Sequence, residues 1–280
     1  MNKKATSFEY QKRGRYFAQI TRGMEDEGGV ELKNFGACDI SAAYRGIYFR
    51  SDFQTMCKIN YCSSCTGRVL APLTSFSCPD TDTLYQKVKL LPWYTLLTVR
   101  STFAIFATVS HSAITHSQYA GLKVKDAIVD QFRERGGRRP SIDKENPDVW
   151  INVHIHNNKA VISFDTSGGS LHKRGYRRAT VRATMQETVA AALIRLSQWD
   201  GTRLLWDPFC GSGTLLCEAF LHFTKRPPSF KRTSFGFEKL PEFLNHSKRL
   251  LKPNGQILLD SSDIIYMFEK GQIVEKGTHD

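Results

Sequence analysis

A regular alternation of apolar and polar residues stands out between residues 149 and 156. Every second residue there is a branched aliphatic one, which is the period of a strand that buries one face. These residues are Val149, Ile151, Val153 and Ile155. Asn157-Asn158 follows, which is typical of a tight turn, and apolar residues return at 160–164. The sequence therefore predicts a β-hairpin.

The first part of the chain mixes short apolar runs with glycine-rich stretches. Residues 16–20 and 47–49 predict strands, while Gly28-Gly29 predicts a turn. Residues 53–70 carry apolar side chains at helical spacing as far as Val69, which predicts a helix. Together these elements predict a small α+β unit.

A second α+β unit is predicted between Leu84 and Phe164. It begins with a helix, and two apolar runs at 95–99 and 103–109 predict strands. A longer helix at 122–134 is expected to end at the two glycines that follow it, because glycine terminates helices.

Beyond the hairpin, the pattern changes to a helix, a strand, a loop and another helix. Thr184-x-x-Glu187 is a capping-box pattern that predicts the start of a helix at 185–198. The apolar stripe of this helix is expected to be Val189, Leu193 and Leu196. Residues 203–206 predict a short strand that leads into a glycine loop and then a helix at 214–220. This order forms the nucleotide-binding half of an α/β sheet.

The loop reads Asp-Pro-Phe-Cys-Gly-Ser-Gly-Thr from Asp207 to Thr214. A P-loop would need a lysine after the second glycine, and a dinucleotide loop would need a third glycine where Leu216 stands. An acidic residue before a Gly-x-Gly loop instead suits S-adenosylmethionine, whose methionine tail is zwitterionic and carries no phosphate. A lone Gly-x-Gly could be a structural turn, but the whole string is more specific. The predicted cofactor-binding residues are Asp207, Cys210, Gly211, Ser212, Gly213 and Thr214.

Composition and charge narrow the class of partner. The chain has 280 residues, 41% of them hydrophobic, which is enough for two or three small domains. Its formal net charge of +12 favours a polyanionic partner, because lysine and arginine release counterions when they contact phosphates. No apolar run approaches the ~18 residues of a membrane helix, and the N-terminus lacks the apolar core of a secretory signal. We therefore expect a cytoplasmic protein without a membrane partner.

The seven cysteines are expected to be reduced thiols. Cys62-x-x-Cys65 could be half of a zinc site, but no second pair follows, so we expect two cysteines on successive turns of a helix. His154-x-His156 could be a metal pair, although two polar residues on the wet face of a sheet is the preferred interpretation. No metal is predicted.

Residues 171–178 form a basic connector that contains one aromatic side chain. Two interpretations stay open for it: a solvated linker, or a phosphate-binding segment in which Tyr176 packs or stacks. Arg138 and Arg139 are expected in an exposed turn after the 122–134 helix, and they are further candidates for contacts to phosphate. The candidate contacts to the polyanion are Arg138, Arg139, Lys173, Arg174, Tyr176, Arg177 and Arg178.

The loop and its neighbours resemble the first motif of the THUMP-domain RNA methyltransferases, above all the bacterial enzymes that modify guanine N2 in large-subunit ribosomal RNA. The likeness includes Leu171–Arg177, Glu187–Leu193 and Arg138–Phe164. It implies an α/β protein that uses S-adenosylmethionine and binds RNA, ribosomal RNA in particular. The implied domains are a ferredoxin-like domain at 1–66, a THUMP domain at 67–168, a basic linker at 169–182 and a partial Rossmann-like class I methyltransferase domain at 183–280.

The resemblance is expected to end after Phe243. The family pattern would continue with a strand ending in an acidic residue, and then with an Asn- or Asp-Pro-Pro-Tyr motif that holds the target amine and base. The sequence contains Pro227-Pro228 and no such motif, so the catalytic residues are unknown. Glu238 lies at a suitable distance from Gly213 to bind a ribose, but we expect it to be structural.

Residues 244–280 are interpreted as an atypical tail. Lys252-Pro253-Asn254-Gly255 is typical of the late part of class I methyltransferases, whereas residues 269–280 resemble the end of a transporter ATPase domain. Residues 203–280 supply roughly half of what a seven-stranded sheet with its helices needs, so we expect the middle of the domain to be missing.

Three functional hypotheses follow. The first is a ribosomal RNA guanine-N2 methyltransferase, and the second is a catalytically defective RNA-binding protein that keeps the THUMP module. A small-molecule methyltransferase is a weaker third, because the basic N-terminal part of the chain would then have no role.

Overall fold

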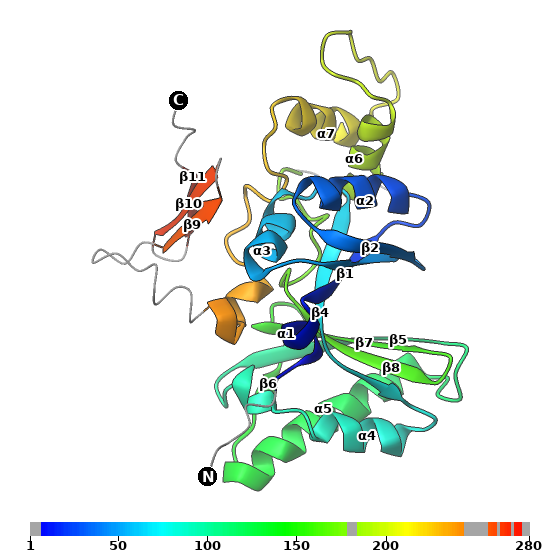
Figure 1. The fold of residues 1–280 in the computed structure, drawn as a ribbon, viewed down its shortest axis with the longest axis vertical. Coiled ribbons are helices and arrows are strands. Elements are labelled where there is room, and N and C mark those ends of the chain that lie inside the picture. Colours follow the sequence, from blue (N-terminus) through cyan, green and yellow to red (C-terminus); the bar gives the residue numbers. More distant parts are fainter. Residues whose placement is uncertain (1–6, 178–183, 244–256, 262–263, 270–271, 276–280) are drawn as a thin grey trace. The chain divides into compact units, whose positions relative to one another are not determined.

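The computed structural model describes residues 7–177, 184–243, 257–261, 264–269 and 272–275. These residues belong to two compact units, whose segments alternate along the chain (Figure 1). The first unit comprises residues 1–15, 70–169 and 236–245, and the second comprises residues 16–69, 170–235 and 246–280. Each unit is considered by itself below.

The N-terminal half of the second unit has the order β-α-β-β-α-β. The elements are β1 (Arg15–Ile20), α2 (Glu25–Asn34), β2 (Cys38–Ala43), β3 (Gly46–Arg50), α3 (Phe53–Cys62) and β4 (Thr66–Ser77), and the last residues of β4 belong to the first unit. The strands lie in the order β2-β3-β1-β4. This order and connectivity are those of a ferredoxin-like domain, as the family resemblance predicts.

The prediction of a turn at Gly28-Gly29 is wrong, because both glycines lie inside helix α2. Their role is close packing. A methyl group added at Gly28 would overlap Cδ1 of the buried Ile20 side chain on β1, so the missing side chain lets the helix approach the strand. At Gly29 the same methyl group would find ordinary contacts at 3.6 and 3.7 Å.

Replacing these two neighbouring glycines with alanine should therefore have opposite effects. We expect Gly28→Ala to destabilise the second unit by about 1–3 kcal/mol, because the added methyl group overpacks the helix–strand contact. Gly29→Ala should be neutral or stabilise by about 0.5–1 kcal/mol, because alanine is the better helix former. Urea unfolding of the two variants measures the difference. Equal changes would show that the α2–β1 contact is not tightly packed.

The helix predicted at 53–70 is shorter than expected. Helix α3 begins after Asp52, whose Oδ1 accepts a hydrogen bond from the Thr55 amide at 2.7 Å, and it ends at Cys62. Val69 lies in β4 instead, and Cys65 lies between the two elements. The prediction that Cys62 and Cys65 occupy successive helical turns is therefore wrong, since the backbone becomes extended at Ser63.

The first unit is a mixed sheet covered by two helices. Its elements are α1 (Glu9–Arg13), the end of β4, α4 (Thr81–Lys89), η1 (Trp93–Thr95), β5 (Thr102–Ser110), α5 (Ser117–Gly136), β6 (Ser141–Ile142), β7 (Val149–His156), β8 (Lys159–Asp165) and η2 (Gly236–Lys239). The strand order is β4-β8-β7-β5-β6. Strand β7 runs antiparallel to β8 and parallel to β5. Helices α4 and α5 lie along one face of this sheet (Figure 1).

The predicted hairpin is confirmed. Strands β7 and β8 pair in register from Ile151–Phe164 to His156–Lys159, and Asn157 and Asn158 turn the chain with φ values of 48° and 55°. The strand predicted at 103–109 and the helix predicted at 122–134 are also present. The strand predicted at 95–99 is wrong. Pro92 begins a short 3-10 turn there, and the buried Trp93 donates from Nε1 to the Val88 carbonyl at 2.8 Å.

The remainder of the second unit contains two described helices, α6 (Glu187–Leu196) and α7 (Thr214–Phe223). The predicted stripe on α6 is wrong: Leu193 and Leu196 are exposed, and the buried face is formed by Thr188, Ala190, Ala191, Ala192 and Ile194. Small residues on that face allow close packing of α6. The backbone of the tail forms a three-stranded antiparallel sheet in the order β11-β10-β9 (Gln272–Glu275, Ile264–Glu269 and Ile257–Ser261). The predicted Lys252–Gly255 turn lies outside the described residues.

Among the helices of the described residues, none has both the length and the apolar character required to cross a membrane.

Candidate cofactor-binding site

The loop from Asp207 to Thr214 is a tight turn that leads directly into α7. Oδ1 of Asp207 accepts a hydrogen bond from the Phe209 amide at 3.2 Å, and the Gly213 amide donates to the Cys210 carbonyl at 2.7 Å. Gly211 and Gly213 have φ values of 52° and 70°, in the left-handed region that favours glycine. The two predicted loop glycines are therefore needed for the backbone to turn twice within three residues.

The start of α7 is an open anion-binding end. Gly213 is the N-cap residue and has no side chain that could cap the helix amides. The amides of the first helical turn also lack partners within the helix. A Cβ atom at Gly213 would meet no described atom within 4 Å, so a ligand can approach the backbone here. Such an end binds a carboxylate through its amides and the helix dipole. It fits the carboxylate of a methionine tail.

Thr214, the first residue of α7, contacts the protein through its side chain. Its side chain is buried, and Oγ1 lies 3.0 Å from Nη2 of Arg177, which donates to it, and 3.0 Å from the Ser212 hydroxyl. Of the predicted cofactor residues, Thr214 can thus offer a ligand only its backbone amide, whereas Cys210 and Gly211 are exposed. The structure brings the predicted loop residues together at one helix end.

The predicted strand before the loop is not formed. Residues 203–206 have no strand partner among the described residues, and without a neighbour the backbone groups of a strand cannot form a ladder. Leu204 is 95% exposed, Trp206 80% and Phe209 93%. The prediction of a strand at 203–206 is therefore wrong, and these side chains do not form a core in the described part of the chain.

A buried ion pair joins the basic connector to α7. Nε of Arg174 lies 3.5 Å from Oε1 of Glu218, and the two side chains are 0% and 1% exposed. Arg174 also donates to the carbonyls of Leu171 at 2.9 Å and of Ser64, which lies just before β4. The Tyr176 hydroxyl donates to the same Glu218 oxygen at 2.8 Å. Burial raises the pKa of Glu218, while Arg174 and Tyr176 act in the opposite direction.

Arg177 ties the connector to both α6 and α7. Its Nε lies 3.1 Å from Oε1 of Glu187, and its Nη1 donates to the Thr184 hydroxyl at 2.6 Å in addition to the Thr214 contact. The predicted capping box is therefore wrong. The N-cap of α6 is Gln186, and Thr184 and Glu187 both bind Arg177 instead of the helix amides.

The structure separates the candidate RNA contacts into two groups. Arg138, Arg139 and Lys173 are exposed, and their contact with RNA remains a prediction. The prediction for Arg174 is wrong, because its guanidinium is buried against Glu218. Tyr176 and Arg177 are likewise engaged with Glu218, Glu187 and Thr214, which leaves little of either for a phosphate. Arg178 lies outside the described residues.

Two carboxylates that support the site were missed by sequence reasoning. One is Glu218 itself, and the other is Glu31 on α2, which is buried and accepts hydrogen bonds from the amides of Ser64 at 2.9 Å and Cys65 at 3.1 Å. Arg195 on α6 lies 3.8 Å from Glu31 and 3.5 Å from Glu27. The available signal was a single acidic residue among the apolar residues of α7.

The remaining sequence candidates lie on other elements. Glu238 lies in the short helix η2 of the first unit. All seven cysteines are free, and the described residues contain no cluster of three or more side chains that could hold a metal ion. His154 and His156 lie on the exposed face of the hairpin.

Three family models match the chain in succession. They are the RlmL ferredoxin-like domain at residues 15–70, the THUMP domain at 78–165 and the RMKL-like methyltransferase domain at 174–267. The third match continues past Phe243, where the resemblance was expected to end. It favours the interpretation of the tail as a methyltransferase segment as far as residue 267.

Relatives of known sequence and structure agree with these models. Ribosomal RNA large subunit methyltransferase K/L of Syntrophotalea carbinolica is 42% identical over 227 residues, which are 80% of this chain and 32% of that protein. The structure of a predicted N6-adenine-specific DNA methylase from Listeria monocytogenes superposes with a TM-score of 0.71 at 30% identity, covering 84% of this chain and 62% of that one. "SMU.472, a putative methyltransferase complexed with SAH" gives a TM-score of 0.70 at 29% identity, covering 81% and 60%.

The ferredoxin-like domain, the sheet covered by α4 and α5, and the glycine loop before α7 together define a THUMP-domain protein with a methyltransferase-type loop. As the sequence resemblance predicts, the chain carries a ferredoxin-like domain, a THUMP domain and a methyltransferase-type domain in the order of their family models, and it is similar to ribosomal RNA large subunit methyltransferases K/L. It spans about a third of the length of the curated K/L relative and about three fifths of the two solved structures.

Proposed function

We propose that this chain binds S-adenosylmethionine at residues 207–214 and serves in the methylation of RNA, with an exocyclic guanine amine of large-subunit ribosomal RNA as the target. The observation that carries the proposal is the open N-terminus of α7, where Gly213 holds a left-handed conformation and leaves the first amides accessible. Its support from relatives is the cofactor product SAH in the SMU.472 structure and the ribosomal RNA named for the K/L relative.

Different groups of the loop would bind the two charged ends of the methionine tail. The amides at the start of α7 would hold the carboxylate of the methionine tail, and the Asp207 carboxylate supplies the opposite charge for its ammonium group. The cofactor supplies an electrophilic methyl group. The protein's contribution is to hold the loop still, and Arg177 does this by fixing Thr214, the first residue of the helix, against Glu187 on α6. Orientation of this kind is the main source of acceleration for a methyl transfer.

A second candidate function is RNA binding without methyl transfer. The sequence favours it in one respect: these 280 residues contain no Asn- or Asp-Pro-Pro-Tyr motif, so the group that would accept the target amine's hydrogen bond is not identified. The exposed apolar side chains of Leu204, Trp206 and Phe209 beside the loop point the same way, since no described strand covers them.

The two functions separate in a pair of measurements on the full chain. Calorimetric titration with S-adenosylhomocysteine tests the loop, and transfer of a labelled methyl group to unmodified large-subunit ribosomal RNA tests the reaction. We expect binding in the first and incorporation in the second. Binding of RNA without either result would establish the second function, and absence of all three would overturn both.

A further inference from the structure

The face of the first unit's sheet opposite α5 carries an unusual row of side chains. Gly121 of α5 packs against Ile105 and Ala107 of β5, at 3.7 and 3.6 Å from its ideal Cβ position, so odd-numbered positions of β5 face the helix. Even-numbered positions therefore face away from it. The register pairs Thr108 with His154 and Ser110 with His156, which places both histidines on that opposite face.

Three imidazole rings gather at the end of this face near the hairpin turn. The rings of His154 and His156 lie nearly parallel, with centroids 6.2 Å apart and planes at 13°. His111, just after β5, sets its ring edge-on to His156 at 5.3 Å and 81°. All three residues are exposed. This arrangement presents flat aromatic surfaces to solvent.

Hydroxyl groups on β5 fix the orientation of two of these rings. The Thr108 hydroxyl lies 2.9 Å from Nδ1 of His154, and the Ser110 hydroxyl lies 2.9 Å from Nδ1 of His156. The other ring nitrogen of each, Nε2, makes no hydrogen bond within the described part of the chain. Each ring is thus held at one nitrogen and can offer the other to a ligand.

The charges around the rings favour an anion. Lys159 lies opposite His156 in the hairpin and is exposed. Two nearby carboxylates are engaged away from the rings. Glu9 of α1 accepts hydrogen bonds from the amide and hydroxyl of Ser75 on β4, and Asp148 accepts them from the amide and hydroxyl of Thr102 at the start of β5. Protonation of His154 would add to the positive charge of Lys159.

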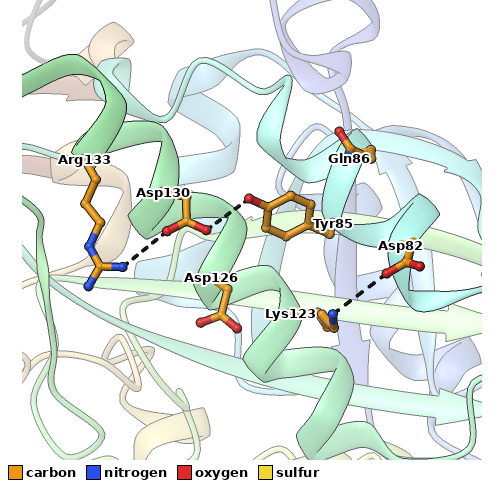
Figure 2. A pocket seen from close by; sticks show the side chains of 7 residues that line it. All are labelled: Asp82, Tyr85, Gln86, Lys123, Asp126, Asp130 and Arg133. Atoms are coloured by element: carbon orange, nitrogen blue, oxygen red, sulfur yellow. Dashed lines mark hydrogen bonds and ion pairs between the residues drawn. The ribbon is translucent and has the colours of Figure 1, made fainter.

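The groove between the two helices of the same unit differs from this face. The groove between α4 and α5 is lined by three aspartates, Asp82, Asp126 and Asp130, together with Lys123 and Arg133 (Figure 2). Its basic groups are already paired, since Arg133 lies 3.3 Å from Asp130 and Lys123 lies 3.8 Å from Asp82. The sheet face therefore accommodates a polyanion better than this groove does.

The sheet face also has a second aromatic platform. Phe106 stands two residues before Thr108 on β5, on the same face, and about half of its surface is exposed. Exposed aromatic and imidazole rings beside basic groups are the combination that binds single-stranded RNA, because bases stack on the rings while phosphates contact the charges.

We propose that His154 and His156, with His111, Phe106 and Lys159, form a contact site for single-stranded RNA on this sheet face. The inference rests on the proposed RNA function and assigns to it a specific surface. Bases stack on the parallel rings of His154 and His156, and Lys159 and the protonated form of His154 bind phosphates.

The site should respond to pH in one direction. Burial of part of the ring, and the neighbouring His156, lower the pKa of His154, so this imidazole is neutral at pH 7.5. Because phosphate favours the charged form, RNA binding should strengthen as the pH falls below the ordinary histidine value of about 6.5. The change should also appear as a steeper salt dependence, by about 0.7 in logarithmic slope for each additional phosphate contact on a single strand.

The test is RNA binding by the full chain at pH 7.5 and pH 5.8, over a range of salt, with a single-stranded ribosomal RNA oligonucleotide as the probe. Two double variants separate stacking from charge. His154→Gln/His156→Gln should weaken RNA binding by about five-fold or more at both pH values, because stacking of a base is lost. The same variant should abolish the pH-dependent change in the salt dependence of binding. His154→Tyr/His156→Tyr should keep binding at pH 7.5 and lose only the pH dependence.

Lys87→Gln is the matched control, because it removes an exposed positive charge from α4 on the helical side. It should leave both the affinity and its pH dependence unchanged. If the glutamine double variant binds RNA as tightly as the wild type, this inference is overturned and the proposed methyltransferase function is left intact. A Zn²⁺ requirement for the histidine-dependent binding would overturn it in favour of a metal site. If the wild type neither binds the cofactor nor transfers a methyl group, the proposed function alone is overturned.

Discussion

Arg174→Met should destabilise the second unit by about 3–5 kcal/mol. The substitution removes the partner of a buried carboxylate and leaves Glu218 uncompensated, and an unpaired buried charge costs far more than the net value of the pair. Methionine fills much of the same volume without bringing a charge. Urea unfolding and hydrogen exchange of the α7 amides would measure the global and the local loss.

The pH dependence of this variant identifies the cause. Burial already raises the pKa of Glu218 in the wild type, and removal of Arg174 takes away the charge that opposes this shift. The folded state then binds the proton more tightly than the unfolded state. A group of this kind lowers stability as the pH rises above its unfolded value of about 4.3, so the deficit of Arg174→Met should shrink as the pH falls toward that value.

The double variant Arg174→Met/Glu218→Gln is the matched control. Glutamine can still accept the hydrogen bond from the Tyr176 hydroxyl but carries no charge, so most of the lost stability should return. The double variant should also lose the pH dependence. If the double variant is as unstable as Arg174→Met, the arginine acts through its bonds to the Leu171 and Ser64 carbonyls and not through Glu218.

The sequence predicted those features whose determining residues lie close together in the chain. The hairpin at 149–164 was predictable because its alternation and its Asn157-Asn158 turn lie within a few residues of each other. The loop glycines were predictable for the same reason, since their positive φ values follow from a turn inside the motif. Local patterns of this kind carry both the fold of an element and the position of the candidate site.

The connector shows where local patterns fail. Its arginines are basic in composition, and composition alone left open whether they face solvent or phosphate. The structure gives a third answer, because the partners of Arg174 and Arg177 are Glu218 and Glu187 on the two helices that follow. These carboxylates are remote in sequence and look like ordinary helix residues, so no spacing rule pairs them with the connector.

Gly28 and the segment 203–206 fail for a similar reason. A glycine pair normally predicts a turn, but Gly28 lies in a helix that packs closely against Ile20. Only the tertiary contact between the helix and Ile20 explains the glycine. An apolar run predicts a strand, but a strand exists only beside another strand, and none of the described residues supplies one for 203–206. In both cases tertiary neighbours outweigh the local preference.

Gly213→Ala should weaken binding of S-adenosylhomocysteine by about ten-fold or more. At φ +70° a side chain costs about 1–2 kcal/mol, and the loop can relieve that strain only by rotating the peptide that sets the start of α7. The rotation would turn the first amides away from the ligand. The added methyl group itself meets nothing within 4 Å of the described atoms, so a packing clash does not contribute.

Gly23→Ala provides the comparison that separates strain from ligand binding. Gly23 lies in the same unit, with φ +85° and also with nothing within 4 Å of its Cβ position, so alanine there should cost a similar amount of stability. Isothermal titration calorimetry should show normal S-adenosylhomocysteine binding by Gly23→Ala and weak binding by Gly213→Ala. Equal binding by the two variants would mean that the backbone geometry at Gly213 does not hold the cofactor, because the variants share the strain and differ only in its position.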